Sequence, residues 1–253
     1  MNTVKVRNVV IGEGIPKIIV PIVGKTREEI LSAAESFKGV RFDIVEWRVD
    51  WYDDIFDPDK VLETSKKLRE TLGDTPILFT FRTSKEGGEK AIDPDEYAGL
   101  NITAAASGYV DMVDVEAFTG DDIVKKIIDG AHEHGVKVIA SNHDFNKTPD
   151  KDDLVGRLKK MQELGADIPK IAVMPKSKKD VLTLLSATEE FATNIADRPI
   201  ITMSMAGTGL ISRLCGECFG SAATFGAVGK VSAPGQMDAE GLDTVLNLIH
   251  GAM

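Results

Sequence analysis

The chain has 253 residues, a hydrophobic content of 43%, a charged content of 28% and a formal net charge of -10. No apolar run reaches the roughly 20 residues that a transmembrane helix needs, and an acidic chain lacks the basic surface that nucleic acid or an anionic membrane selects. These values exclude a membrane protein and a nucleic-acid binder. Because the first residues lack the apolar core of a secretory signal, we expect a cytoplasmic protein with reduced cysteines.

The predicted elements begin with a segment over 4–11 whose weak alternation indicates a β-hairpin. An apolar strand over 17–23 follows, and Thr26 and Glu29 form a predicted capping box that begins a helix. The same unit of strand and helix then recurs along the chain. Further strands are predicted over 42–48, 76–82, 109–116, 136–142, 167–174, 199–205 and 221–226.

Capping and turn residues set the predicted helix boundaries. The second helix is expected to begin at Asp57-Pro58 and to turn Leu62 inward, and the fifth is expected to begin at Thr148-Pro149. The seventh is expected to begin near Thr208, and the last is the amphipathic helix at the end of the chain.

Eight such units joined by short loops predict a closed (β/α)8 TIM barrel, formed by one domain over 1–253, with the hairpin closing the bottom of the barrel. A doubly wound open sheet is the main alternative. The barrel is favoured because no G-x-G-x-x-G turn follows the first strand.

Lys170 is a lone lysine in the apolar segment 167–174. Burial disfavours the charged form of an amine and frees its lone pair for attack on a carbonyl, as in Schiff-base lysines. The alternative is a lysine at a strand end whose ammonium reaches solvent. The sequence places Lys170 near the start of its strand, so its long stem would have to carry the amine toward the mouth of the barrel.

Polar residues gather at the predicted carboxyl ends of the strands, where barrel enzymes have their active sites. His143 follows the strand next to that of Lys170, and neighbouring strands lie about 4.8 Å apart. The pair predicts Schiff-base chemistry with a histidine that carries protons, and Glu86 could orient the imidazole. Taken singly, each could be a structural charge or a capping residue. The set comprises Glu46, Arg48, Arg82, Glu86, Asp114, Glu116, Asn142, His143, Lys170, Met203, Met205, Arg213, Ser232 and Gln236.

Cys215 and Cys218 have the spacing of a redox or metal motif. No second pair of cysteines exists to complete a zinc site, and a redox motif would be expected at the start of a helix in a small domain. Burial on a helix is the preferred interpretation. Neither a metal ion nor a cofactor is expected.

The chain resembles the type I 3-dehydroquinate dehydratases, which are Schiff-base lyases, over nearly its whole length. The motifs that carry the resemblance are EWRVD at 46–50, FTFR at 79–82 with KEGG at 85–88, SNHDF at 141–145, GADIPKIAVMP at 165–175, MSM at 203–205 with SR at 212–213, FGSAATF at 219–225 and SAPGQ at 232–236.

The resemblance implies that Lys170 forms an imine with the C3 ketone of 3-dehydroquinate. His143 would remove the C2 proton and then help to expel the C1 hydroxyl as water, a syn elimination that gives 3-dehydroshikimate. Glu86 would hold His143, and Arg213 would bind the substrate carboxylate. The residues implied to bind hydroxyls and to help close the site are Glu46, Arg48, Arg82, Ser232 and Gln236.

The loop from Ser232 to Gln236 is expected to fold over bound substrate, and the family implies a homodimer. Two alternatives stay open at this stage. A class I aldolase acting on a sugar phosphate could use Gly207 and Gly209 as a phosphate loop. A binding or regulatory barrel would keep the arginines but would not need the amine.

Overall fold

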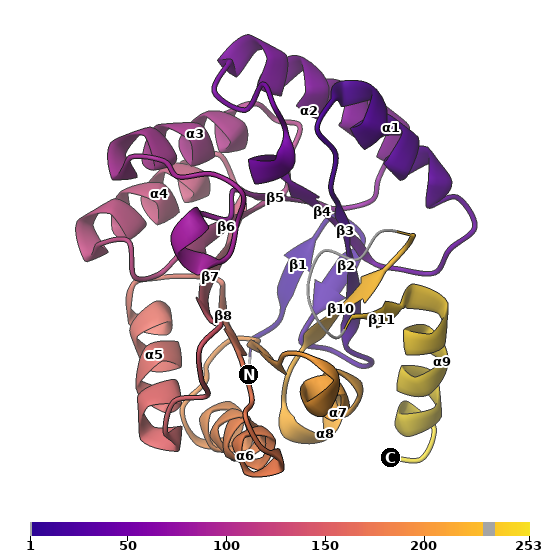
Figure 1. Ribbon diagram of the computed structural model, residues 1–253, viewed down its shortest axis with the longest axis vertical. Coiled ribbons are helices and arrows are strands. Elements are labelled where there is room, and N and C mark those ends of the chain that lie inside the picture. Colours follow the sequence, from indigo (N-terminus) through magenta and orange to yellow (C-terminus); the bar gives the residue numbers. More distant parts are fainter. Residues whose placement is uncertain (1, 230–235) are drawn as a thin grey trace.

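The computed structural model describes residues 2–229 and 236–253 and has the predicted barrel (Figure 1). Eight parallel strands pair in chain order around the centre, and β11 (Met237–Asp238) adds a short parallel edge beside the last of them. The barrel closes where Ile200 and Ser221 form a bridge. The eight strands are β3 (Lys17–Ile22), β4 (Ile44–Arg48), β5 (Ile77–Thr80), β6 (Met112–Glu116), β7 (Lys137–Asp144), β8 (Ile168–Val173), β9 (Ile201–Ser204) and β10 (Ala223–Ala227).

Helices surround the strands, and none in the described ranges is long and apolar enough to cross a bilayer. They are α1 (Arg27–Ser36), α2 (Pro58–Leu72), α3 (Pro94–Ala106), α4 (Asp121–Glu133), α5 (Lys151–Glu163), α6 (Lys178–Asn194), α7 (Leu210–Leu214), α8 (Gly216–Phe219) and α9 (Ala239–His250), with single 3-10 turns η1 (Val49–Trp51), η2 (Ser84–Glu86) and η3 (Gly207–Gly209).

Local capping explains where the helices begin and where the predictions were wrong. Thr26 caps α1, but the Glu29 carboxylate accepts the N–H of Lys25, so the predicted capping box is not formed. Helix α5 begins two residues after the predicted Thr148-Pro149. The seventh unit has three short helical pieces, η3, α7 and α8, in place of the one predicted helix. Leu62 was predicted to point inward, but it is 41% exposed because it lies on the outer face of α2.

The predicted hairpin closes the bottom of the barrel. Strands β1 (Val4–Val6) and β2 (Val9–Ile11) pair antiparallel and lie behind the barrel strands in Figure 1. Their buried side chains join one apolar cluster with the first inward residues of the barrel strands. This cluster includes Val4, Val6, Val9, Ile11, Ile44, Leu78, Met112, Ile139, Ile168 and Ile201.

The inward side chains change from apolar to polar along each strand. Successive strand residues point to opposite faces, so every second residue enters the barrel. Above the apolar layer come Glu46, Thr80, Asp114, Ser141, Lys170 and Met203, and two residues further along come Arg48, Arg82, Glu116, His143, Ala172 and Met205. The outward residues between them, such as Val113, Val115, Ile171 and Val173, pack in the apolar layer under the helices. The barrel is therefore apolar at its bottom and charged toward its mouth.

Candidate active site

Lys170 lies in the middle of β8 rather than near its start, as the third of six residues. Its side chain points into the barrel because it alternates with the outward Ile171, and it is only 3% exposed. The Nζ atom lies 3.1 Å from Oδ2 of Asp114 and 4.6 Å from the centre of the Phe225 ring. The amine therefore needs no long reach to the cavity, and it has a buried carboxylate as its partner.

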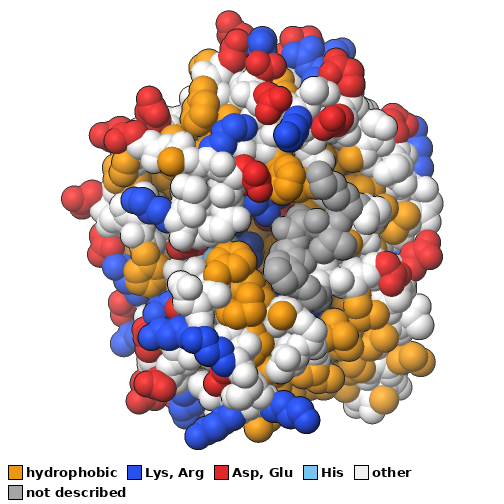
Figure 2. Space-filling model, in the orientation of Figure 1, with side chains coloured by type: hydrophobic (Ala, Val, Ile, Leu, Met, Phe, Trp, Pro, Cys, Tyr) orange, Lys and Arg blue, Asp and Glu red, His pale blue; other side chains and the backbone are white. Residues whose placement is uncertain are grey.

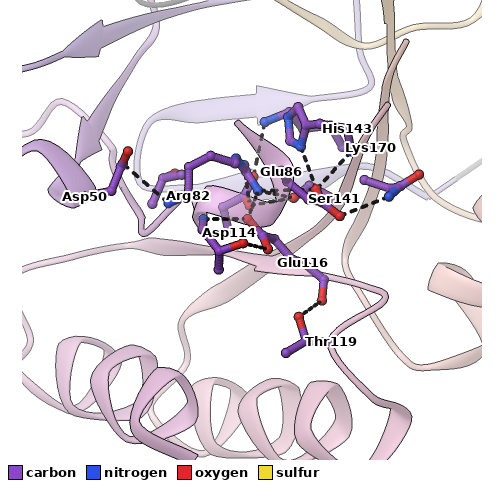
Figure 3. Close-up of polar contacts among 12 residues, drawn as sticks. Asp50, Arg82, Glu86, Asp114, Glu116, Thr119, Ser141, His143 and Lys170 are labelled. Carbon is purple, nitrogen blue, oxygen red and sulfur yellow. Dashed lines mark hydrogen bonds and ion pairs between the residues drawn. The ribbon is translucent and has the colours of Figure 1, made fainter. Parts of the chain in front are cut away.

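Asp114 connects Lys170 to Arg82 (Figure 3). Its Oδ1 accepts hydrogen bonds from Nη2 of Arg82 at 2.7 Å and from Oγ of Ser141 at 2.6 Å. Arg82 also donates to Glu116 and to Ser141, at 3.0 Å each. We call these bonded side chains, Arg82, Asp114, Glu116 and Ser141, the floor of the cavity. Because their donors and acceptors are satisfied inside the barrel, the network holds them in fixed positions.

Glu86 reaches His143 from the turn η2, which follows β5. The two residues after Glu86 must be glycines. Gly87 has a φ of 85°, which side chains rarely allow, and a Cβ on Gly88 would lie 1.8 Å from the carbonyl oxygen of Arg82. Oε2 of Glu86 accepts the backbone N–H of His143 and faces its Nδ1, at 2.9 Å in both cases. Oε1 accepts from Asn142 at 3.0 Å, so both oxygens are fixed.

These contacts determine the state of the imidazole. Because the ionised Glu86 carboxylate only accepts hydrogen bonds, Nδ1 carries the ring proton and Nε2 keeps its lone pair. Burial, together with the charges of Arg82 and Lys170, lowers the pKa of His143 well below its ordinary value. His143 is therefore a neutral imidazole, and its Nε2 is the basic atom when Glu86 is ionised.

The remaining predicted residues stand around the same cavity. Arg48 makes a two-point contact with Asp50, at 2.8 Å for each bond, and Glu46 accepts from Thr80 at 3.0 Å. Arg213, on α7, is buried beside Met203, and burial lowers the pKa of its guanidinium to about 10. Burial penalises this cation, so an anionic ligand in the cavity would offset the penalty.

One cavity brings together most of the predicted site residues that the structure describes. Asp114, Glu116 and Asn142 do not line it, but each bonds to a residue that does. Figure 2 shows Lys or Arg side chains at the centre of this face, among hydrophobic ones. Ser232 lies outside the described residues, as does most of the loop that was expected to fold over substrate. The cavity is lined by Glu46, Arg48, Arg82, Glu86, Gly87, His143, Phe145, Lys170, Ala172, Met203, Met205, Arg213, Phe225 and Gln236.

Asp114 and Phe225 lie around Nζ, and neither contact with Lys170 was predicted from the sequence, although Asp114 belongs to the predicted polar set. The signal for Asp114 was the spacing of Met112, Asp114 and Glu116, whose alternation puts all three inside the barrel. Nothing in the sequence identifies Phe225 as the ring under the amine.

The two cysteines are free thiols. Cys215 is half-buried between α7 and α8, and burial raises the pKa of its thiol. Cys218 is exposed on α8, so the expectation that both are buried is wrong for it. Within residues 2–229 and 236–253, no group of three or more His, Cys, Asp or Glu side chains is arranged to hold a metal ion.

Comparisons with known proteins agree with this geometry. The family model described as Type I 3-dehydroquinase matches residues 18–253. The 3-dehydroquinate dehydratase of Salmonella agona (strain SL483) is 58% identical over 252 residues, covering 100% of both chains.

Two solved structures are also similar. A type I 3-dehydroquinate dehydratase from Clostridium difficile with covalently modified comenic acid has a TM-score of 0.97 at 54% identity and covers 100% of this chain and 99% of its own. The 3-dehydroquinate dehydratase from Geobacillus kaustophilus has a TM-score of 0.96 at 40% identity, with coverage of 99% and 97%. The chain therefore belongs to the type I 3-dehydroquinase family.

Proposed function

We propose that this protein is a lyase that dehydrates 3-dehydroquinate to 3-dehydroshikimate, a step of the shikimate pathway, through a Schiff base on Lys170. The observation that carries the proposal is the meeting of one buried amine and one neutral histidine in a single cavity. They come from the paired strands β7 and β8, in which Ser141 is the partner of Lys170 and His143 is the partner of Ala172. No metal ion or cofactor takes part in the proposed chemistry.

The amine of Lys170 attacks the C3 ketone, whose oxygen leaves as water, and an iminium forms. The iminium withdraws electrons from C2, and Nε2 of His143 then removes the C2 proton. The electron pair shifts to expel the C1 hydroxyl, which takes the proton from His143 and leaves as water on the same face. A water molecule finally hydrolyses the imine and releases the enone product and Lys170.

Different residues of the cavity bind different groups of the substrate. Arg213 binds the substrate carboxylate, since a planar guanidinium matches that group with two hydrogen bonds. Glu46, Arg48, Ser232 and Gln236 bind the hydroxyls. Arg82 lines the cavity and is expected to bind a hydroxyl as well, and its bonds to Asp114 and Glu116 support an added role in positioning these carboxylates.

Two measurements on one sample test this function. With 3-dehydroquinate, turnover should produce the absorbance of a conjugated enone, and borohydride should trap a reduced adduct of the substrate mass on Lys170. A sugar-phosphate aldolase would be trapped by its own substrate without enone absorbance, and a binding barrel would give neither signal. The absence of an adduct with 3-dehydroquinate would overturn the proposal.

The pH dependence of kcat/KM should report Glu86. Burial raises the pKa of the Glu86 carboxyl to about 7. Below that pH the protonated carboxyl donates to Nδ1 of His143, which moves the ring proton to Nε2 and removes the base. We expect kcat/KM to fall about tenfold per pH unit below about pH 7 and to level off above it.

Glu86→Gln tests this assignment, because an amide does not titrate. The variant should be slower by about tenfold or more at neutral pH, and its profile should lack the inflection near pH 7. An unchanged inflection in Glu86→Gln would assign the titration to another group.

We also propose that the protein is a cytoplasmic homodimer, with one domain over 1–253. Support for the dimer comes from the hydrophobic side chains that gather over α8 and α9 in Figure 2. Leu248 of α9 and Met253 at the end of the chain are large hydrophobic side chains that are 69% and 74% exposed. Contiguous apolar patches of this kind are typical of protein interfaces. Sedimentation of the purified protein measures its oligomeric state, and a monomer at micromolar concentration would contradict this proposal.

A further inference from the structure

We propose that Asp114 is a catalytic residue: it is the counter-ion that keeps the Schiff base on Lys170 protonated. The inference rests on the proposed Schiff-base chemistry and deepens it, because it identifies what holds the reactive nitrogen in its cationic form. Its test can fail while the lyase assignment stands.

The two carboxylate oxygens of Asp114 have different partners. Oδ1 is held by Arg82 at 2.7 Å and by Ser141 at 2.6 Å, whereas Oδ2 lies 3.1 Å from Nζ of Lys170. Asp114 is fully buried, so no solvent competes for these bonds. The carboxylate is therefore fixed with one oxygen directed at the nitrogen that becomes the iminium.

Asp114 is unsuited to taking the proton itself. Burial alone would raise its pKa, but the charges of Arg82 and Lys170 and the hydrogen bond from Ser141 outweigh burial and lower the pKa to about 2. Such a carboxylate is a weak base at neutral pH and keeps its negative charge. Its contribution is a fixed charge beside the nitrogen, which needs no rearrangement during the reaction.

The balance of the covalent step agrees with this role. The ammonium of Lys170 and the C3 ketone give an iminium and water: the C=O bond breaks, the C=N bond forms, and two of the three nitrogen protons leave with the oxygen. The nitrogen keeps one proton and its positive charge. That remaining N–H can donate to Oδ2, just as the ammonium does before the reaction, so the ion pair persists from start to finish.

A counter-ion is needed because the charges around Nζ are of both signs and are engaged elsewhere. The cavity is lined by Arg48, Arg82 and Arg213 and by the carboxylates of Glu46 and Glu86. Glu46 accepts from Thr80 and Glu86 accepts from Asn142 and His143, whereas Asp114 is the carboxylate that bonds to Nζ. Without Asp114 the imine would lose its proton at a lower pH, and a neutral imine withdraws electrons from C2 far less than an iminium does. Elimination would then slow although the covalent bond had formed.

The test compares the adducts of the wild type and of Asp114→Asn with 3-dehydroshikimate. A protonated Schiff base is recognised in the Raman spectrum, because its C=N stretch shifts in D2O. The wild-type adduct should show this shift at about pH 8, whereas the Asp114→Asn adduct should show it only about two pH units lower. Because each pH unit is tenfold in the protonated fraction, kcat of the variant at about pH 8 should fall about 100-fold.

Glu116→Gln is the matched control. It also removes a buried carboxylate from Arg82, at 3.0 Å, but the structure gives it no bond to Nζ. Its adduct should keep the wild-type isotope shift at about pH 8. If Glu116→Gln loses the shift as Asp114→Asn does, general disturbance of the floor explains both, and the inference is wrong.

Ser141→Ala keeps the proposal testable if Asp114→Asn does not fold. It removes one of the two bonds to Oδ1, so the adduct should lose its proton at a pH that is lower by a fraction of a unit. An isotope shift unchanged from the wild type in the folded variants would overturn the counter-ion role. A wild type that forms no adduct at all would instead overturn the proposed function.

Discussion

Replacing Lys170 by methionine is expected to lower turnover of 3-dehydroquinate by at least about 10⁴-fold and to abolish the borohydride adduct. Methionine keeps an unbranched stem of similar length but has no nucleophile. Asp114 would lose its partner at 3.1 Å but would keep its bonds to Arg82 and Ser141. We therefore expect a folded variant that is less stable by about 1–3 kcal/mol. Enone absorbance, intact mass and urea unfolding measure the three effects.

Lys178→Met is the matched control for that change. Lys178 is exposed at the first position of α6, so the same substitution there should leave turnover and adduct formation as in the wild type. Substantial turnover by Lys170→Met would exclude the Schiff-base route, whatever the remaining affinity for substrate. A variant that unfolds would be replaced by Lys170→Gln, whose amide can still donate to Asp114.

The sequence was sufficient to predict the barrel because the evidence for it is local and repeated. Each strand is an apolar run, and each helix has an amphipathic face with turn residues at its ends. Eight repeats make a wrong boundary harmless to the fold: α5 begins two residues late and the seventh helix is broken, yet the strand order is the one expected. The broken helix was missed because the helical pattern from Thr208 onward does not reveal the three separate pieces that tertiary packing produces.

The site was predicted as a list of residues, but their pairing was not. Glu86 and His143 were joined correctly, whereas the partner of Lys170 is Asp114, 56 residues away along the chain. That contact depends on how far each strand is staggered against the next, and the amino-acid pattern of one strand does not contain this information. Placing Lys170 near the start of its strand had the same origin: its height in the barrel is set by the pairing of β7, β8 and β9.

Replacing His143 by alanine should separate the covalent step from the proton transfer. The variant keeps the amine of Lys170 and the carboxylate of Asp114, so 3-dehydroquinate should still form the imine that borohydride traps. Elimination should slow by about 10²- to 10⁴-fold, the usual contribution of a positioned base. Rapid-quench mass spectrometry should therefore show the substrate adduct accumulating, where the wild type passes on to product.

His134→Ala provides the comparison for that experiment, since His134 is exposed at the end of α4 and does not line the cavity. It should behave as the wild type in both adduct formation and turnover. If His143→Ala fails to form the adduct although it is folded, the histidine also takes part in making the imine, and the proton that leaves the Lys170 ammonium would pass through Nε2. The two variants thus separate the reaction into the steps before and after the iminium. Lys170→Met should not form the iminium, whereas His143→Ala should form it but should be slow in the elimination that follows.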